Sequence, residues 1–245
     1  MPENQEQTEK DLKKLKREKL SNLVSKGIDP YKYRFSVTHA IADVKKKYAD
    51  IGHDKSEEQV TVAGRMMGTR LHGKAGFADI LGQDDRIQAY FKMDQIGEDK
   101  FELFKLLDTG DIIALTGRVF RTKMGEVTIW VEDFDLLTKS LIPFPEKYHG
   151  LQNIELRYRQ RFLDLIVNPD VRKTFIMRSK IISYIRSWLD CRGYLEVETP
   201  ILQPIYGGAL ARPFVTRHKY LEMDLYLRIA PELYLKRISV GGLEK

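Results

Sequence analysis

Between residues 59 and 138 the chain carries five stretches in which hydrophobic residues recur at every second position, which predicts β-strands. In the third stretch, Ile87, Ala89 and Phe91 fall on one side of the strand and the residues between them on the other. A stretch with helical spacing, Glu98–Asp108, separates the third strand from the fourth. The predicted strands are Gln59–Leu71, Phe77–Leu81, Arg86–Lys92, Asp111–Thr122 and Val127–Leu137.

This order of elements predicts a small closed barrel. Five strands with one helix between the third and the fourth are typical of the OB-fold, and Gly125 suits a tight turn between the last two strands. Upstream, Glu9–Lys26 has a stripe of leucines and ends at Gly27, so we expect a helix that precedes the barrel. The basic residues of this helix favour either a solvated surface or the edge of a nucleic-acid-binding surface.

A second domain follows. Prolines and glycine without periodicity predict a linker over residues 140–153. Beyond it, a long amphipathic helix is closed by Gly193, and an alternating strand ends at Pro200. The predicted elements are helix Thr174–Arg192, strand Tyr194–Thr199, strand Asp224–Ala230 and helix Pro231–Val240. We therefore divide the chain into a helical extension (1–58), a barrel (59–139), the linker (140–153) and a second domain (154–245).

Composition narrows the class of protein. With 31% charged and 42% hydrophobic residues, the 245-residue chain has the composition of a globular protein. Its net charge of +6 suits a polyanionic partner without being specific for one. Cys191 is the single cysteine, which excludes an internal disulfide and a thiolate metal cluster and favours a reducing compartment. There is no apolar run of about 18 residues and no signal-like N-terminus, so we expect a cytoplasmic protein without a membrane partner.

The outward face of the predicted barrel combines aromatic, basic and amide side chains. Unstacked bases gain ~1–3 kcal/mol on aromatic rings, an amide can bond to a base edge, and arginines can hold phosphates. The alternative is that the aromatic rings pack beneath the N-terminal helix. The mixture favours binding of an oligonucleotide. Alternation places on this face Arg65, Phe77, Arg86, Gln88 and Tyr90.

Several motifs, in order along the chain, resemble one family. Arg192–Pro200 (RGYLEVETP), which follows the long helix, resembles the first signature of class II aminoacyl-tRNA synthetases. Gly207–Gly242 is similar to the amino-acid-binding stretch and the opening of the second signature in the bacterial-type lysyl-tRNA synthetases of class IIb. Motifs that resemble the same family are also found at Arg17–Tyr31 (REKLSNLVSKGIDPY), Gly64–Arg70 (GRMMGTR), Phe120–Glu126 (FRTKMGE) and Gly150–Ile166.

One motif separates the lysine enzymes from their aspartate and asparagine relatives, which share the barrel and the first signature. This motif is the string Gly-Gly-x-x-Ala-Arg-Pro-Phe, here Gly207–Phe214. Leu210, Lys219 and Tyr220 depart from the residues usual in the family, which puts details of the pocket in doubt but not the class.

The resemblance implies an α+β fold, in which a five-stranded OB-fold anticodon-binding barrel with a preceding helix is followed by an incomplete class II catalytic domain with an antiparallel sheet. It implies a lysine–tRNA ligase that activates lysine with ATP and Mg²⁺ and transfers it to tRNA-Lys, as a homodimer. We expect no DNA partner. Because the chain stops at Lys245, within the second signature, we expect these 245 residues alone neither to activate lysine nor to bind ATP tightly.

The resemblance also implies roles for individual residues. In the lysine site, a backbone carbonyl and a carboxylate would accept hydrogen bonds from the α-amino group. In the barrel, Phe77 would stack on a base, while Gln88 and Glu126 would contact base edges. We expect no metal ligand and no complete catalytic set within this chain. The expected residues are Gly208, Ala230 and Glu232 for lysine, Arg65, Phe77, Gln88 and Glu126 for the anticodon, and Gly193 and Pro200 for the dimer interface.

Other interpretations stay open at this point. The chain could be a stand-alone tRNA-binding protein in which the barrel works and the second domain only dimerises. It could also be a scaffold that has no affinity for tRNA. Glu232, taken without the resemblance, is an ordinary acidic residue in the first turn of a helix, where the helix dipole favours it.

Overall fold

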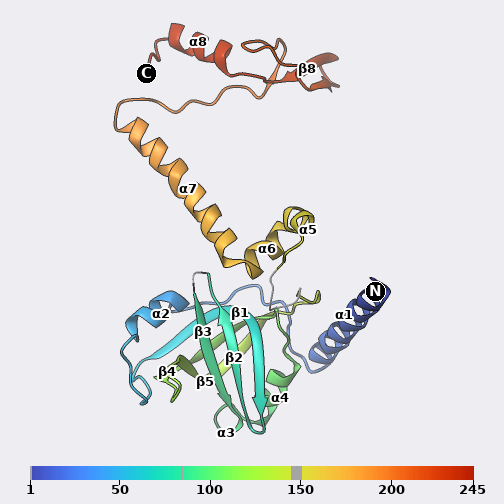
Figure 1. Ribbon diagram of the computed structural model, residues 1–245, viewed down its shortest axis with the longest axis vertical. Coiled ribbons are helices and arrows are strands. Elements are labelled where there is room, and N and C mark those ends of the chain that lie inside the picture. Colours follow the sequence, from blue (N-terminus) through green and yellow to red (C-terminus); the bar gives the residue numbers. More distant parts are fainter. Residues whose placement is uncertain (1, 84, 145–150) are drawn as a thin grey trace. The chain divides into compact units, whose positions relative to one another are not determined.

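The computed structural model describes residues 2–83, 85–144 and 151–245. The chain forms two compact units, Met1–Gly150 and Leu151–Lys245 (Figure 1). Their boundary falls within the stretch 140–153 that we expect to be a linker, and residues 145–150 of that stretch lie outside the described part.

A closed five-stranded barrel forms the body of the first unit, as predicted. The strand order is β1-β2-β3-β5-β4; β3 and β5 pair in parallel and the other neighbours are antiparallel. Each strand starts and ends within two residues of its predicted bounds. The strands are β1 (Gln59–His72), β2 (Ala75–Leu81), β3 (Arg86–Lys92), β4 (Ile112–Arg121) and β5 (Val127–Thr138).

Helices precede the barrel and interrupt it. The predicted N-terminal helix is present as α1 (Pro2–Ser25), and the helix between the third and fourth strands as α4 (Glu98–Leu106). Two short helices, α2 (Ile41–Lys47) and α3 (Met93–Ile96), were not predicted. Gly97, at φ 85°, separates α3 from α4, and both helices lie at one end of the barrel (Figure 1).

The barrel interior holds the hydrophobic core. The predicted division of β3 is confirmed, because Ile87, Ala89 and Phe91 are buried while the intervening side chains are not. Phe91 stacks on Phe104 of α4, with ring centroids 4.0 Å apart. This contact closes one end of the barrel, and it explains why a helix is inserted between β3 and β4.

A charged cluster joins α1 to the barrel. The ammonium group of Lys139 is buried and donates to Asp111 at 2.8 Å and to Asp108 at 2.6 Å. From α1, Lys19 also binds Asp108, at 2.6 Å, and Lys16 donates to the carbonyl oxygens of residues 109 and 140. Burial opposes ionisation of Asp108, but hydrogen bonds from Lys139 and Lys19 outweigh it and hold its pKa below the ordinary value.

The second unit contains four helices and a small sheet in its described residues. The sheet is antiparallel with the order β6-β8-β7, which agrees with the predicted antiparallel catalytic domain. The residues that are buried in this unit are all polar, namely Asp164, Thr199 and Gln203. The elements are α5 (Ile154–Arg159), α6 (Arg161–Val167), α7 (Pro169–Asp190), β6 (Leu202–Gln203), β7 (Val215–His218), β8 (Met223–Leu227) and α8 (Glu232–Val240).

One predicted strand is wrong. Tyr194–Thr199 alternates in polarity but is irregular in the structure. Its main chain bonds elsewhere: the N–H of Tyr194 donates to Leu189 and that of Leu195 to Lys245. A strand needs a neighbouring strand to pair with, and no strand within the part of the chain that the structure describes lies in register with this segment.

The charged cluster predicts a pH dependence of folding. A carboxyl whose pKa is depressed in the folded state stabilises the fold above its ordinary pKa of about 3.9 and loses that contribution as the pH falls through the lower, folded value. We expect Asp108→Asn to be about 1–2 kcal/mol less stable at neutral pH and to lose less stability than the original chain below pH about 4.

Denaturant unfolding of both proteins between neutral and strongly acidic pH measures this difference. Asp94→Asn is the matched control, because Asp94 pairs with Lys92 at 3.2 Å on the surface, and it should leave the pH profile unchanged. If the free energy of unfolding fell equally at acidic pH in the original chain and in Asp108→Asn, the pKa of Asp108 would not be depressed in the folded state.

Candidate nucleic-acid and amino-acid sites

A groove of about 640 Å³ lies on the outer face of the barrel. It brings together three of the predicted anticodon residues, namely Phe77 of β2, Gln88 of β3 and Glu126 of the β4–β5 hairpin. Cationic side chains also line it, among them Arg70 and Lys45, whose ion pairs with Asp79 and Asp85 are partly exposed. The groove thus combines an aromatic ring, hydrogen-bonding groups and positive charge.

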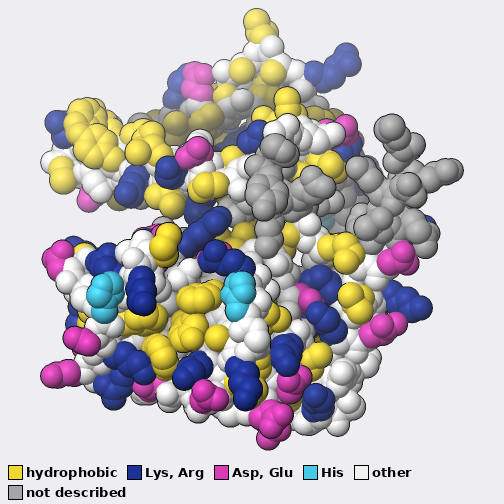
Figure 2. All heavy atoms as spheres, turned by 60° about the horizontal axis from the view of Figure 1, so that its bottom comes forward, with side chains coloured by type: hydrophobic (Ala, Val, Ile, Leu, Met, Phe, Trp, Pro, Cys, Tyr) yellow, Lys and Arg dark blue, Asp and Glu magenta, His cyan; other side chains and the backbone are white. Residues whose placement is uncertain are grey.

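Aromatic rings continue from Phe77 across the same face. The Phe77 and Tyr90 ring centroids lie 4.8 Å apart, and Tyr90 lies 5.0 Å from Trp130. Phe120 contacts both Tyr90 and Trp130 edge-on. Phe77 is therefore supported from behind by a packed aromatic row, which holds its ring in place at the groove. Figure 2 shows one face of the molecule on which apolar side chains are exposed between lysine and arginine side chains.

Gln88 and Glu126 are connected through a third residue. The Thr128 hydroxyl donates to Gln88 Oε1 at 3.1 Å and lies 3.2 Å from the main-chain oxygen of Glu126. Gln88 and Thr128 are direct partners in the parallel β3–β5 pairing. The Glu126 carboxylate itself has no hydrogen-bond partner among the described residues, so it remains available as an acceptor.

Arg121 fixes the hairpin that carries Glu126. Its guanidinium donates to the carbonyl oxygens of Gly125, at 2.7 Å, of Ile51, at 2.8 Å, and of Ala49. Within the hairpin, Gly125 has a φ of 89°, a conformation that favours glycine. The hairpin is thereby attached to the loop that follows α2. Sequence reasoning missed Arg121 and Thr128, although Arg121 lies within the Phe120–Glu126 motif.

Arg65 lies apart from the other predicted anticodon residues, and we leave it out of the proposed surface. Its guanidinium donates to the Gly110 carbonyl at 2.8 Å and lies over the Phe144 ring. Partial burial lowers its pKa. Alternation correctly placed the residue outside the barrel core. It could not show that the strand carries Arg65 to a different part of the barrel surface.

In the second unit, the three residues expected to bind lysine lie together. A Cβ atom on Gly208 would lie 3.2 Å from the Ala230 Cβ and 3.3 Å from the Glu232 Cβ, so the main chain approaches both side chains closely. Gly208 has a φ of 86°, which a larger residue would adopt only with strain. Glu232 accepts a hydrogen bond from Lys236 at 2.6 Å, which lowers the pKa of the carboxyl.

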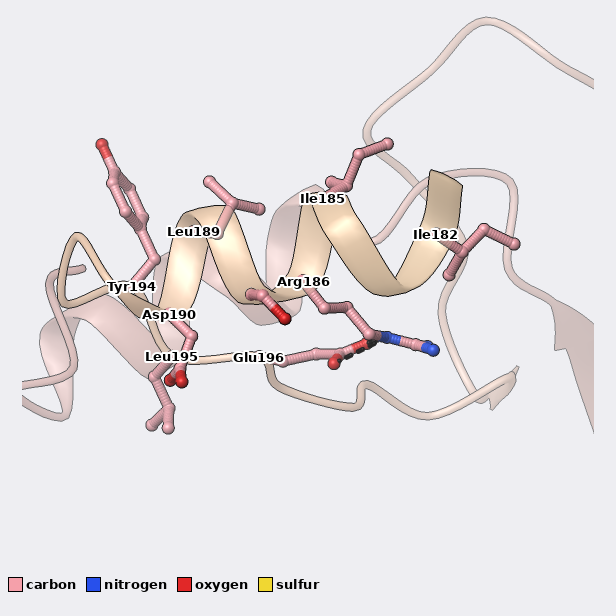
Figure 3. Close-up of a pocket in the computed structure, with 9 residues that line it drawn as sticks. Ile182, Ile185, Arg186, Leu189, Asp190, Tyr194, Leu195 and Glu196 are labelled. Atoms are coloured by element: carbon pink, nitrogen blue, oxygen red, sulfur yellow. Dashed lines mark hydrogen bonds and ion pairs between the residues drawn. The ribbon is translucent and has the colours of Figure 1, made fainter. Parts of the chain in front are cut away.

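The helix α7 and the segment after it carry an apolar surface. No α7 residue is buried within this unit, and a hollow of about 690 Å³ is lined by residues of α7 and of the segment 194–196. Figure 3 shows the Arg186 side chain alongside Glu196, to which it donates at 2.9 Å. Gly193, at φ 77°, turns the chain out of α7, and Pro200 lies beyond the same segment. Gly193 thus adjoins this surface, while Pro200, itself exposed, does not line the hollow.

Both units match known families. Residues 60–137 match the OB-fold nucleic acid binding domain of the tRNA anticodon family, and residues 153–245 match the class II tRNA synthetases (D, K and N). The second unit is therefore similar to the class II tRNA synthetases of the group for aspartate, lysine and asparagine, and the first unit to nucleic-acid-binding OB-fold domains.

The most similar relatives include lysine–tRNA ligases. The protein of Methanoculleus marisnigri is 56% identical over 93% of this chain and 45% of its own length. The protein of Syntrophomonas wolfei is 53% identical over 96% of this chain and 47% of its own length. The protein of Clostridium botulinum is 53% identical over 99% of this chain and 47% of its own length. The chain spans about half the length of the curated relatives it matches. Among the described residues, no helix is both long and apolar enough to cross a bilayer.

The Arg121 contacts predict a specific effect on the hairpin. We expect Arg121→Ala to lower the free energy of unfolding by about 1–3 kcal/mol, because three main-chain acceptors lose their donor. The amides of residues 122–126 should exchange their hydrogens faster than the rest of the barrel. Hydrogen exchange and denaturant unfolding measure these effects.

Lys123→Ala is the matched control. Lys123 is an exposed cation in the same hairpin, and its removal should change stability by less than about 0.5 kcal/mol. Equal exchange rates in the hairpins of the two variants would show that Arg121 does not hold it.

Proposed function

We propose that the chain is part of a lysine–tRNA ligase, in which the barrel binds the anticodon loop of tRNA-Lys and the second unit contributes to binding lysine. The observation that supports this most strongly is that Phe77, Gln88 and Glu126, assigned from the family resemblance, lie around one groove. The names of the relatives favour the ligase over a stand-alone tRNA-binding protein.

The chemistry of the groove suits uracil, the base that dominates a lysine anticodon. Uracil offers an N–H donor at N3 between two carbonyl acceptors. The Glu126 carboxylate can accept from the N3–H, and the Gln88 amide can donate to a carbonyl oxygen. Phe77 would stack on the base, and Arg70 and Lys45 would neutralise nearby phosphates. Stacking supplies affinity for any base, whereas the edge contacts supply the selection.

Glu232 and Gly208 are proposed to hold the α-amino group of lysine. A carboxylate and a main-chain carbonyl are acceptors that an ammonium requires. In the structure the Glu232 carboxylate already accepts from one ammonium group, that of Lys236. Lys236 bonds to Oε1, whereas Oε2 lies on the side of Gly208, 3.5 Å from the position of a Cβ on that glycine, and can accept from a second ammonium group.

ATP and Mg²⁺ are proposed as cofactors of the whole enzyme, as the class requires. The described residues offer no group of three or more histidine, cysteine or acidic side chains that could hold a metal ion, and no catalytic step is assigned to them. We further propose that the enzyme is a cytoplasmic homodimer, with the surface around α7, Gly193 and Pro200 at its interface. That surface is apolar and exposed within its own unit.

Binding of an anticodon stem-loop RNA tests the proposed function. We expect Phe77→Ala to weaken binding about 10- to 100-fold, since stacking on an aromatic ring contributes ~1–3 kcal/mol per base. Fluorescence titration of labelled RNA at fixed ionic strength is the measurement, because affinity for RNA depends on salt.

Tyr33→Ala is the matched control, because Tyr33 is a fully exposed aromatic residue that does not line the groove. It should bind as the original chain does. Negligible affinity in all three proteins would favour a scaffold, and equal measurable affinity would show that RNA binds elsewhere.

A further inference from the structure

Thr128 occupies an unusual position on the outer face of the barrel. Its side chain points to the same side as the groove residue Gln88, its direct partner in the β3–β5 pairing. Even so, Thr128 has no exposed surface, because Gln88 and the hairpin cover it. A hydroxyl buried there cannot contact RNA. Any effect that it has on base recognition must pass through its neighbours.

The Thr128 hydroxyl contacts both residues that are proposed to bond to the base edge, Gln88 through its side chain and Glu126 through its main chain. Oγ1 donates to Gln88 Oε1 at 3.1 Å and lies 3.2 Å from the Glu126 main-chain oxygen. The carbonyl end of the Gln88 amide is thus turned toward the barrel. The Nε2 group has no acceptor among the described residues, and Gln88 lines the groove. The end of the amide that faces the groove is therefore its donor end.

The orientation of an amide decides which base it favours. With its N–H groups toward the groove, Gln88 can donate to the O4 carbonyl of uracil. Cytosine carries an amino group in the same place, and two donors cannot bond to each other. An amide rotated by 180° would reverse this preference. A glutamine without a fixed partner presents either end, so it would discriminate poorly between the two pyrimidines.

We propose that Thr128 is a positioning residue, whose hydroxyl fixes the orientation of the Gln88 amide so that the groove selects uracil over cytosine. This inference rests on the proposed function, since it concerns the same RNA groove. It adds to the proposed RNA-binding residues one that does not touch RNA, and it gives a physical reason why the groove would select uracil over cytosine.

The test measures the preference for uridine rather than affinity alone. Each uridine in the loop of an anticodon stem-loop RNA is replaced in turn by cytidine, and the ratio of the two dissociation constants is measured for the 245-residue chain. Gln88→Ala identifies the nucleotide that Gln88 contacts, as the one at which the preference is lost. We expect the original chain to prefer uridine about tenfold there, which is the usual effect of leaving one polar group unpaired.

Thr128→Val removes the hydroxyl and keeps the branched shape. We expect it to reduce the preference to about two- to threefold, while binding to an RNA with an all-cytidine loop stays unchanged. Thr128→Ser keeps the hydroxyl and should retain the preference. Thr128→Ala serves as a second variant without the hydroxyl, should the valine variant fail to fold. The melting temperature of each variant verifies that the barrel is intact.

A double-substitution cycle shows whether Thr128 acts through Gln88. In the Gln88→Ala background, Thr128→Val should cause no further loss of preference; in the Glu126→Ala background it should keep its effect. Three results would each overturn the inference: an undiminished preference for uridine in folded Thr128→Val, a preference of the original chain for cytidine, or a loss of the preference for uridine in Thr128→Ser. None of them would contradict the proposal that the groove binds RNA. An original chain that binds no stem-loop RNA would overturn the proposed function and, with it, this inference.

Discussion

The parallel pairing of β3 with β5 is the contact on which the rest of the first unit depends. All other neighbouring strands are antiparallel, and this one pairing closes the sheet into a barrel. Closure sends Ile87, Ala89 and Phe91 inward, where they form the core. It also sets Gln88 beside Thr128 and Tyr90 beside Trp130 on the outside. The register of the β3–β5 pairing therefore determines both which side chains form the core and which ones lie on the outer face that would contact RNA.

The two units reach stability in different ways. The first buries a continuous set of aliphatic and aromatic side chains, to which a buried lysine–aspartate cluster attaches α1. In the second, the described residues include a sheet and several helices, but the buried side chains are polar and the large apolar ones are exposed or only half-buried. Burial of apolar surface is the main stabilising term in folding. The apolar side chains that stay accessible in the second unit are therefore the surface through which it would gain further stabilising contacts.

Much of this could be predicted from the sequence, and the exceptions have physical causes. The barrel strands were placed to within two residues, because alternation is strong when one face is buried. Phe77, Gln88 and Glu126, and likewise Gly208 and Glu232, could be grouped because the family resemblance assigns them to common sites. The predicted strand at residues 194–199 failed because pairing depends on a neighbour that local pattern cannot supply. The position of Arg65 apart from the groove, and the contacts of Arg121 and Thr128, were not foreseen for a related reason. They involve main-chain or side-chain atoms far away in sequence, which alternation does not encode.

The contacts of Arg121 have a consequence for how this surface can vary. Among the described residues, the guanidinium donates to carbonyl oxygens alone, those of Ala49, Ile51 and Gly125. Every amino acid provides such an oxygen, so side chains along the loop after α2 can be exchanged without removing an acceptor. Substitutions in this loop would therefore leave the geometry of the β4–β5 hairpin unchanged. A change in the length of that loop would have the opposite effect, because it would shift these carbonyl oxygens away from the Arg121 guanidinium.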